Sequence, residues 1–326
     1  MTFIRMPLPA QKDRIRPPAL RRGDTVGVIA PAGPITGQAL QSGLASLELR
    51  GYRPLYLPSI LDRDWYFAGP LDRRLRELHE MFANPEVRGI VCFRGGYGSN
   101  YLLPHLNLDL IGRNPKFFCG CSDITTLLTY LCDKAGMIVF HGPMLQRDAQ
   151  TDGVDEESWF SAATSGDAYT IGFGDEVQTL VPGIADGMMY GGCLSLLCAS
   201  LGTPYEIDAR GTVLFIEDIA EPAYRIDRML MQLKLAGKLN EVRGLIFGEM
   251  LDCGRGAEGY ALQEVILRVV GDLGVPVVCG VRSGHVTRRN ITIPLGVAAQ
   301  LDAGASVALR LAAAVRTEGA TIPVPK

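Results

Sequence analysis

Residues Phe118–Ile124 read FCGCSDI, and this stretch passes from a buried strand into a helix within a few residues. The apolar run that begins at Lys116 predicts a strand that ends at Cys121. Apolar residues then recur at the spacing of one helix face, at Ile124, Leu127, Leu128 and Leu131. A strand that leads directly into a helix is the repeating unit of an α/β fold with parallel strands.

The same alternation extends over the whole first half of the chain. Strands are predicted at Asp24–Ala30, Arg53–Leu57, Val87–Phe93, Lys116–Cys121 and Met137–Phe140, with helices over Gln38–Arg50 and around Leu71–Phe82. This order predicts a mostly parallel sheet covered by helices on both faces. Catalytic loops in such folds lie at the carboxyl ends of the strands, which here read APAGP, RGGYG, GCSD and FHGP.

The second half has a different pattern, which predicts a second domain. Residues 146–178 are acidic and rich in Gly and Ser, which predicts a connection between domains with some structure of its own. Beyond them we expect a small-residue helix over Gly191–Leu201, strands at Thr212–Glu217, Val242–Met250 and Pro276–Val281, and short β-rich pieces near the C-terminus. We therefore predict a lead-in over residues 1–23, an N-terminal α/β domain over 24–165 and a smaller, β-rich α/β domain over 180–326.

Composition and charge exclude several classes of protein. The net charge of −3 is close to balance, which gives no basic footprint for nucleic acid. No secretory signal and no run of about 18 apolar residues are visible, so we expect no membrane span and a cytoplasmic protein. The eight cysteines form no CxxC pair and the four histidines do not cluster, so we expect free thiols, no metal site and no cofactor.

Ser122 stands at a strand exit and is the first candidate for a catalytic residue. In a sharp strand-to-helix turn its hydroxyl would be exposed, and the N–H of Asp123 would be a donor to an oxyanion. The competing interpretation is a helix N-cap, a role that serine fills well. Because the segment lacks the second glycine of the usual nucleophile turn, it does not decide between the two interpretations by itself.

The loop Arg94–Gly98, RGGYG, follows another buried strand. Paired glycines allow the backbone to approach a ligand closely, so this loop is a candidate for the second oxyanion donor. A phosphate cradle is disfavoured, because no Gly-Lys-Ser/Thr follows and the dinucleotide fingerprint is absent. A simple tight turn is the remaining interpretation.

A serine nucleophile needs a base, and the base needs a carboxylate that orients it. Glu217 and Asp218 end an apolar strand, where alternation sends them to opposite faces, so only one of them can orient a histidine. His141 and His285 each follow a strand, whereas the other two histidines have structural or solvated settings. Spacing alone leaves both the carboxylate and the base undecided.

At these residues the chain closely resembles the LD-carboxypeptidase family of serine peptidases, which includes muramoyl-tetrapeptide carboxypeptidases and microcin immunity peptidases. The resemblance runs from about residue 16 to about residue 302. It rests on long stretches such as GDTVGVIAPAGP, RGIVCFRGGYGSN, GCSDIT, VLFIEDIAEPAYRIDRMLMQL and GHVTRRNITIPLG. It implies an N-terminal α/β domain, a smaller C-terminal domain and a homodimer.

The resemblance also chooses between the alternatives. The family pattern marks Ser122 of the GCSD segment as the nucleophile, Glu217 rather than its neighbour as the carboxylate, and His285 of the GHVTRRN segment as the base. This chain departs from the family pattern at one position. An aromatic residue commonly precedes the serine in the family, whereas Cys121 precedes it here. The oxyanion donors would be the N–H groups of Asp123 and Gly96. Further candidates to line the substrate groove are Arg94, Gly95, Tyr97 and Asn100.

These assignments imply hydrolysis of the amide bond between the L-centre of a diamino acid and the terminal D-alanine of a cell-wall tetrapeptide. An immunity-type peptidase that cleaves an aminoacyl-nucleotide amide would have the same triad. Trp159 is a candidate platform for its adenine ring, although a tryptophan in such a segment more often serves packing. A non-catalytic muropeptide-binding protein is a third hypothesis, which intact Ser122, Glu217 and His285 disfavour. In each case the partner is a small molecule rather than a nucleic acid or a membrane.

Overall fold

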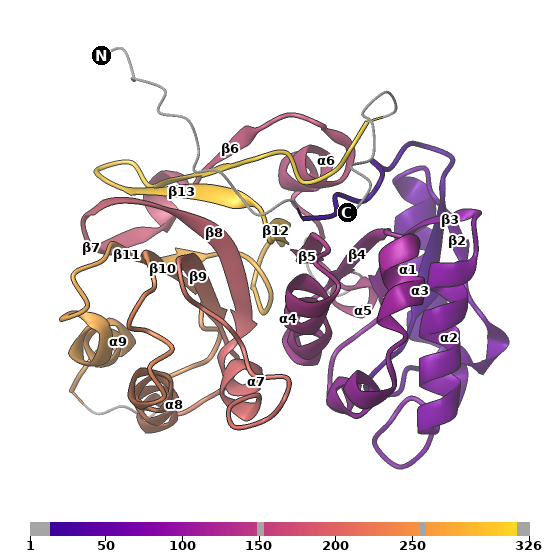
Figure 1. Cartoon of the computed structure of the whole chain (residues 1–326), viewed down its shortest axis with the longest axis horizontal. Coiled ribbons are helices and arrows are strands. Elements are labelled where there is room, and N and C mark those ends of the chain that lie inside the picture. Colours follow the sequence, from indigo (N-terminus) through magenta and orange to yellow (C-terminus); the bar gives the residue numbers. More distant parts are fainter. Residues whose placement is uncertain (1–13, 149–152, 255–258, 318–326) are drawn as a thin grey trace.

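The computed structural model describes residues 14–148, 153–254 and 259–317, so most of the predicted lead-in, residues 1–13, lies outside the described residues. The described chain forms two lobes side by side, each built on one β-sheet with helices packed against it (Figure 1). The first lobe holds most of the N-terminal half and the second most of the C-terminal half. The fold is α/β, as the alternation of strands and helices predicts.

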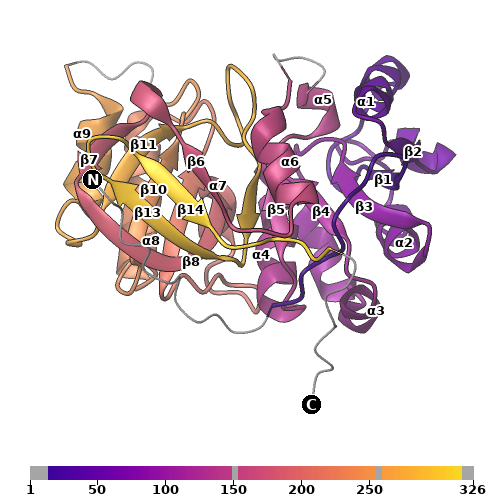
Figure 2. The same cartoon turned by 90° about the horizontal axis from the view of Figure 1, so that it is seen from above.

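The first sheet has six strands in the order β12-β5-β4-β3-β1-β2. Five of them are parallel: β1 (Thr25–Ile29), β2 (Arg53–Leu55), β3 (Val87–Cys92), β4 (Phe117–Gly120) and β5 (Val139–His141). The helices of this lobe include α1 (Gly37–Leu49), α2 (Leu71–Ala83), α3 (Leu108–Arg113), α4 (Thr125–Lys134) and α5 (Leu145–Asp148). Figure 2 shows α1 and α5 on one side of the strands and α2 and α3 on the other. The predicted parallel sheet with helices on both faces is confirmed.

Burial on both faces explains why these strands are almost continuously apolar. β1 and β3 lie inside the sheet, and nearly all of their side chains are shielded from solvent. The covering helices bury one face each, which in α2 includes Leu78, Met81 and Phe82. α2 packs closely on β1, because a Cβ at Gly27 would lie 2.8 Å from Sδ of Met81.

The second sheet has eight strands in the order β6-β14-β13-β8-β9-β10-β11-β7. Its four parallel strands are β8 (Gly183–Cys193), β9 (Thr212–Glu217), β10 (Gly244–Gly248) and β11 (Val277–Val281). Its antiparallel strands are β6 (Tyr169–Gly172), β7 (Gln178–Val181), β13 (Ala298–Ala303) and β14 (Ala308–Leu311). The helices of this lobe within the described residues include α7 (Leu194–Ala199), α8 (Ala223–Leu235) and α9 (Leu262–Val270) (Figure 1).

The predicted helix over Gly191–Leu201 is wrong in its first turn. β8 continues to Cys193, and α7 covers only Leu194–Ala199. A Cβ at Gly191 would lie 1.9 Å from the carbonyl oxygen of Phe215, so only glycine allows β8 to pair with β9 at this point. Small residues suit a close-packed strand as well as a helix, and periodicity does not distinguish the two.

Strand pairing crosses the predicted domain boundaries. β12 (Ile293–Leu295) belongs to the C-terminal half but pairs antiparallel with β5 of the first sheet. β6 lies within the predicted connection and forms an edge of the second sheet, and α6 (Glu156–Thr164) precedes it. The domain limits 24–165 and 180–326 stay predictions.

The described residues of the predicted lead-in pack on the first lobe, where Ile15 pairs with Met137.

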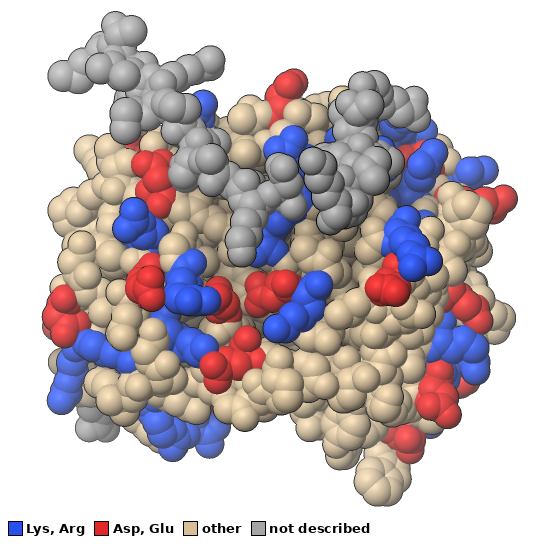
Figure 3. All heavy atoms as spheres, viewed as in Figure 1, with Lys and Arg blue, Asp and Glu red and all other residues tan. Residues whose placement is uncertain are grey.

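The surface gives no sign of a strongly charged partner on the face drawn in Figure 3, where basic and acidic side chains are interspersed. Across the described ranges, no helix is long and apolar enough to span a membrane. All eight cysteines are free, and all of them except Cys253 are buried.

Candidate active site

Ser122 lies in the sharp turn between β4 and α4, where the short 3-10 helix η3 (Ser122–Ile124) begins. Its φ angle is +60°, in the left-handed region that residues other than glycine seldom adopt. The cap position of η3 falls on Cys121, so Ser122 is not the N-cap. Strain of this kind persists only where the surrounding structure imposes it, and it characterises nucleophile turns between a strand and a helix.

Gly95, in the loop after β3, packs directly on Ser122. A Cβ at Gly95 would lie 2.9 Å from Cβ and 3.0 Å from Oγ of Ser122, and 3.2 Å from the backbone N of Asp123. The next residue, Gly96, has a φ angle of +104°, which glycine adopts without strain. The glycine pair therefore brings loop backbone against the serine and against the start of the helix, where the first N–H groups have no partner within the helix.

The side chain of Asp123 ties these two loops together, a role that the sequence did not reveal. Its carboxylate accepts hydrogen bonds from the N–H groups of Gly98 at 3.3 Å and Ser99 at 2.8 Å. The hydroxyl of Ser99 in turn donates to the carbonyl oxygen of Asp123 at 2.6 Å. Burial raises the pKa of Asp123, although these hydrogen bonds act in the opposite direction.

Glu217 and His285 are in direct contact. Glu217 ends β9, and His285 lies in the loop that follows β11. Nδ1 of His285 lies 2.6 Å from Oε2 of Glu217, and the same oxygen accepts the backbone N–H of His285 at 3.0 Å. A carboxylate only accepts hydrogen bonds, so Nδ1 carries the hydrogen and Nε2 is the basic nitrogen of the ring.

Glu217 is fully buried, and burial alone would raise its pKa. The attraction of the His285 and His141 imidazoles outweighs burial and holds the pKa of Glu217 well below its usual range. The carboxylate is therefore ionised at neutral pH, which is the state that stabilises an imidazolium beside it.

His141 ends β5 and approaches the same carboxylate from the first lobe. Its Nε2 lies 3.7 Å from Oε1 of Glu217. In the register of β4 and β5, His141 is opposite Gly120, just before the Ser122 turn. Contacts therefore run from the serine turn through His141 to Glu217 and His285, which brings these residues to the boundary between the two lobes.

The other candidate groups have different partners. Asp218 accepts the N–H groups of Ser195 and Ile219, each at 2.8 Å, so it fixes the start of α7 and not a histidine. His79 accepts the N–H of Asn107 at 3.0 Å, which is a structural contact. Among the described residues, no three His, Cys, Asp or Glu side chains are arranged to hold a metal ion.

Comparison with known proteins accounts for both lobes. Residues 26–142 match the LD-carboxypeptidase N-terminal domain, and residues 186–301 match the LD-carboxypeptidase C-terminal domain. The chain belongs to the LD-carboxypeptidase family. It is accordingly a hydrolase of the serine carboxypeptidase type, and the resemblance seen in its sequence is confirmed.

Relatives of this LD-carboxypeptidase include proteins named as murein peptide carboxypeptidases and a protein named for microcin self-immunity. A probable murein peptide carboxypeptidase of Bacillus subtilis is 38% identical over 299 residues, which cover 90% of this chain and 93% of that protein. A microcin self-immunity protein of Escherichia coli is 30% identical over 317 residues, which cover 86% of this chain and 91% of that one. The solved structure of a muramoyltetrapeptide carboxypeptidase from Oxalobacter formigenes is 29% identical, has a TM-score of 0.81, and the match covers 90% of this chain and 100% of that one.

Of the two roles considered for Trp159, packing and a platform for adenine, the structure of this LD-carboxypeptidase shows packing. The ring lies on α6 and is only 5% exposed, its Nε1 donates to the hydroxyl of Tyr52 at 3.3 Å, and it packs edge-on against Phe117. Four exposed rings and the half-buried ring of Phe67 instead gather beside the RGGYG loop, with neighbouring ring centroids 4.5–6.3 Å apart. We call this set the aromatic cluster; its members are Trp65, Tyr66, Phe67, Tyr97 and Tyr101.

The remaining lining candidates have distinct settings. The guanidinium of Arg94 is half-buried and donates from Nη1 to the carbonyl oxygen of Pro34 at 3.1 Å, so it fixes the loop after β1. Tyr97 is exposed within the aromatic cluster, and Asn100 is exposed in the 3-10 helix η2 (Ser99–His105). Only the last two therefore present their side chains to solvent.

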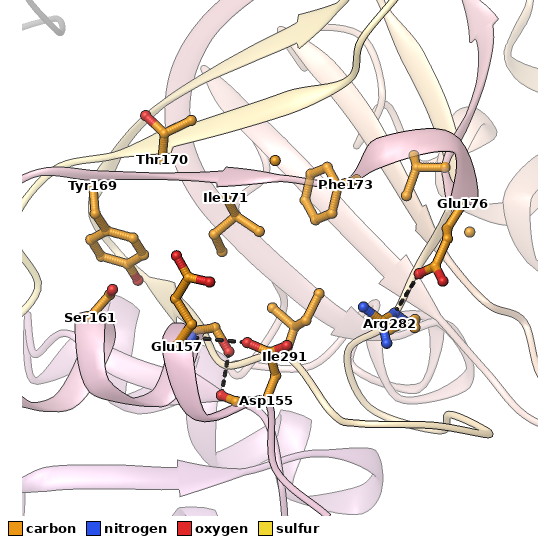
Figure 4. A pocket seen from close by; sticks show the side chains of 14 residues that line it. Asp155, Glu157, Ser161, Tyr169, Thr170, Ile171, Phe173, Glu176, Arg282 and Ile291 are labelled. Carbon is orange, nitrogen blue, oxygen red and sulfur yellow. Dashed lines mark hydrogen bonds and ion pairs between the residues drawn. The ribbon is translucent and has the colours of Figure 1, made fainter. Parts of the chain in front are cut away.

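A cavity of about 140 Å³ adjoins the loop that carries His285 (Figure 4). Arg282 and Ile291 of that loop line it, together with residues of α6 and β6. Arg282 pairs with Glu176 at 3.0 Å, and Arg288 contacts the same carboxylate at 2.6 Å. The candidate catalytic side chains do not line this cavity, so its walls support the loop and do not form the site.

Proposed function

We propose that this LD-carboxypeptidase releases the terminal D-alanine from cell-wall tetrapeptides, with Ser122 as nucleophile, His285 as base and Glu217 as the orienting carboxylate. The observations that carry the proposal are the 2.6 Å contact between Glu217 and His285 and the strained strand-to-helix turn that holds Ser122, two residues after the Gly120 that pairs with His141. Relatives named murein peptide and muramoyltetrapeptide carboxypeptidases support the substrate class.

The reaction proceeds in two steps, acylation of Ser122 and hydrolysis of the resulting ester. Oγ of Ser122 attacks the carbonyl carbon of the scissile amide while Nε2 of His285 accepts the hydroxyl proton, which His285 then delivers to the amine of the departing D-alanine. Water attacks the resulting ester, His285 accepts a proton from it, and the return of that proton to Oγ releases the shortened peptide. Glu217 stays ionised throughout and stabilises the imidazolium.

The oxyanion of each tetrahedral intermediate is stabilised by the N–H groups of Asp123 and Gly96. These donors come from the helix start and from the glycine pair that packs on Ser122. Tyr97 follows on the same loop, Asn100 follows in η2, and both side chains line the substrate groove. Arg94 and Gly95 act through the loop backbone, the first by its bond to Pro34 and the second by its lack of a side chain.

The test is incubation with tetrapeptide and tripeptide muropeptides, read by mass spectrometry. The wild-type enzyme removes one alanine from the tetrapeptide and leaves the tripeptide intact, and Ser122→Ala abolishes the reaction. Ser42→Ala is the matched control, because this serine is exposed on α1 and bonds only within its own helix. An intact tetrapeptide after incubation with the wild-type enzyme contradicts the proposal, as does full activity of Ser122→Ala.

A second candidate is cleavage of an aminoacyl-nucleotide amide by the same triad. The 30% identity to a microcin self-immunity protein and the exposed aromatic cluster beside the RGGYG loop favour it, because rings of this kind stack on a nucleobase. An acyl-adenylate amide tested in parallel with the tetrapeptide decides between them. A higher kcat/KM for the tetrapeptide supports the carboxypeptidase function, and a higher kcat/KM for the acyl-adenylate amide supports the immunity-type function.

We further propose that the enzyme works in the cytoplasm as a homodimer. Eight free cysteines suit a reducing compartment. Members of the family are commonly dimers, and light scattering at micromolar concentration should give the mass of two chains.

A further inference from the structure

The carboxylate of Glu217 lies between two histidines that come from different lobes. One oxygen, Oε2, receives two hydrogen bonds from His285. The other, Oε1, is buried, has no hydrogen-bond partner among the described residues, and faces Nε2 of His141 at 3.7 Å. That nitrogen is likewise buried, and in the described part of the chain it also has no hydrogen-bond partner, so two complementary unsatisfied groups face each other.

The partner of the second ring nitrogen fixes which nitrogen of His141 carries hydrogen. Nδ1 of His141 lies 2.9 Å from Oγ of Ser283, and the hydroxyl can either donate or accept. If Nδ1 carried the only hydrogen, the lone pair of Nε2 would face an ionised carboxylate in a dry environment. Electrostatics therefore favours the form in which Ser283 donates to Nδ1 and the Nε2–H points at Glu217.

The surroundings hold the two groups face to face. A Cβ at Gly284 would lie 2.6 Å from Cδ of Glu217 and 2.9 Å from Cε1 of His141, so the absence of a side chain there lets them meet. Asn290 clamps Gly284 with two hydrogen bonds, of 3.1 Å and 3.0 Å. The ring of His141 also packs edge-on against Phe215, with centroids 5.0 Å apart.

We propose that His141 is a positioning residue, whose Nε2–H holds the free oxygen of Glu217 and so aligns the carboxylate with His285 across the boundary between the lobes. This inference rests on the proposed triad. Because β5 carries His141 beside the Ser122 turn and the second lobe carries Glu217 and His285, the contact also sets the serine relative to its base.

Two isosteric variants separate this role from simple packing. In His141→Gln the amide nitrogen lies where Nε2 was, so a donor to Glu217 remains. In His141→Asn it lies where Nδ1 was, so only the contact with Ser283 remains. We expect kcat to fall about 10- to 100-fold in His141→Asn, the range for a lost hydrogen bond to a charged group, and less than about 3-fold in His141→Gln, with KM unchanged in both.

Equal loss of kcat in the two variants, or kcat in His141→Asn within about twofold of wild type, overturns the proposal. Ser283→Ala should give an intermediate loss, because Nδ1 then loses the donor that keeps the hydrogen on Nε2. Thermal unfolding of each variant shows whether a change in kcat follows a change in stability.

Imidazole nitrogen NMR of the wild-type protein tests the inference without any substrate. The chain has only four histidines, so His141 and His285 can be assigned by single substitutions. We expect His141 to carry hydrogen on Nε2, and the His285 Nδ1–H resonance to shift in His141→Asn but not in His141→Gln. A lone hydrogen on Nδ1 of His141 overturns the inference. If the wild-type enzyme cleaves no tetrapeptide, the proposed function fails while this result still decides the role of His141.

Discussion

Gly95 packs directly on Ser122, because a Cβ there would approach both Cβ and Oγ of the serine within 3.0 Å. The φ angle of Gly95 is not positive, so the backbone itself tolerates alanine. Gly95→Ala should therefore displace the oxyanion donors and lower kcat/KM by about 100-fold or more while the protein stays folded. Steady-state kinetics and the thermal midpoint, measured on the same preparation, check this.

Gly112→Ala is the matched control for this prediction. It lies in α3, a Cβ there meets nothing within 4 Å, and helix propensity favours alanine. Its kcat/KM should equal that of wild type. Retention of more than half of the wild-type kcat/KM in Gly95→Ala would show that the loop moves aside and that its backbone is not held against the serine.

Single residues also show where sequence reasoning stops. Spacing did not choose between His141 and His285 as the base, and in the structure both contact Glu217. The family pattern named His285 alone, because a pattern of this kind marks roles along the chain and not contacts. The carboxylate of Asp123 escaped notice for the same reason, since Gly98 and Ser99 reach it from a distant loop.

At the scale of elements, α2 contains a buried ion pair beneath the loops of the site. Glu77 lies 3.3 Å from Arg73, and both side chains are almost fully buried. Burial raises the pKa of Glu77 from 4.5 to about 7, although Arg73 acts in the opposite direction. Arg73 also donates to three carbonyl oxygens, those of Ser59, Ala30 and Ala68, so it keeps partners if the carboxylate is removed.

The raised pKa predicts how Glu77 affects stability at different pH. The folded state binds the proton of Glu77 more tightly than the unfolded state, so its contribution is fully present below pH 4.5 and is lost as the pH rises to about 7. Relative to wild type, the free energy of unfolding of Glu77→Gln should therefore increase over this range, by roughly 3 kcal/mol at most. Urea unfolding at several pH values measures the difference.

Glu80→Gln on the exposed face of α2 is the control, because its carboxylate is half exposed and its contact with Arg76 is long at 3.9 Å. A difference between Glu77→Gln and wild type that does not vary with pH would mean that Glu77 is already ionised at pH 4.5 and that Arg73 outweighs burial.

The elements that the sequence predicted well are those whose own residues determine them. The strands of the first sheet are buried on both faces, so their apolar runs stand out, and α2 shows a clear helical period. β12 has only three residues, and it is a strand because β5 offers an open edge. The predicted helix begins one turn before α7, because the sequence does not show that Gly191 and Gly192 still belong to β8. Their pairing with β9 depends on tertiary contact.

At the scale of the whole molecule, β12 joins the two lobes. Ile293 and Leu295 are fully buried and pair with His141 and Val139 of the first sheet, although the chain around them belongs to the second lobe. A second contact lies near the site, where the hydroxyl of Thr125 on α4 accepts the N–H of Cys193 at 3.0 Å. The first sheet therefore loses β12 if the second lobe unfolds.

We therefore expect the two lobes to unfold together. Differential scanning calorimetry should show one transition, with equal calorimetric and van 't Hoff enthalpies, because loss of the second lobe strips β12 from the first sheet and exposes the edge of β5. Ile293→Ala removes buried side-chain volume at this joint and should lower the midpoint without splitting the peak, at a cost of about 2–5 kcal/mol. Two resolved transitions in the wild-type protein would show that the lobes are independent domains. The serine and its base would then be aligned only by side-chain contacts across the boundary and not by a shared strand.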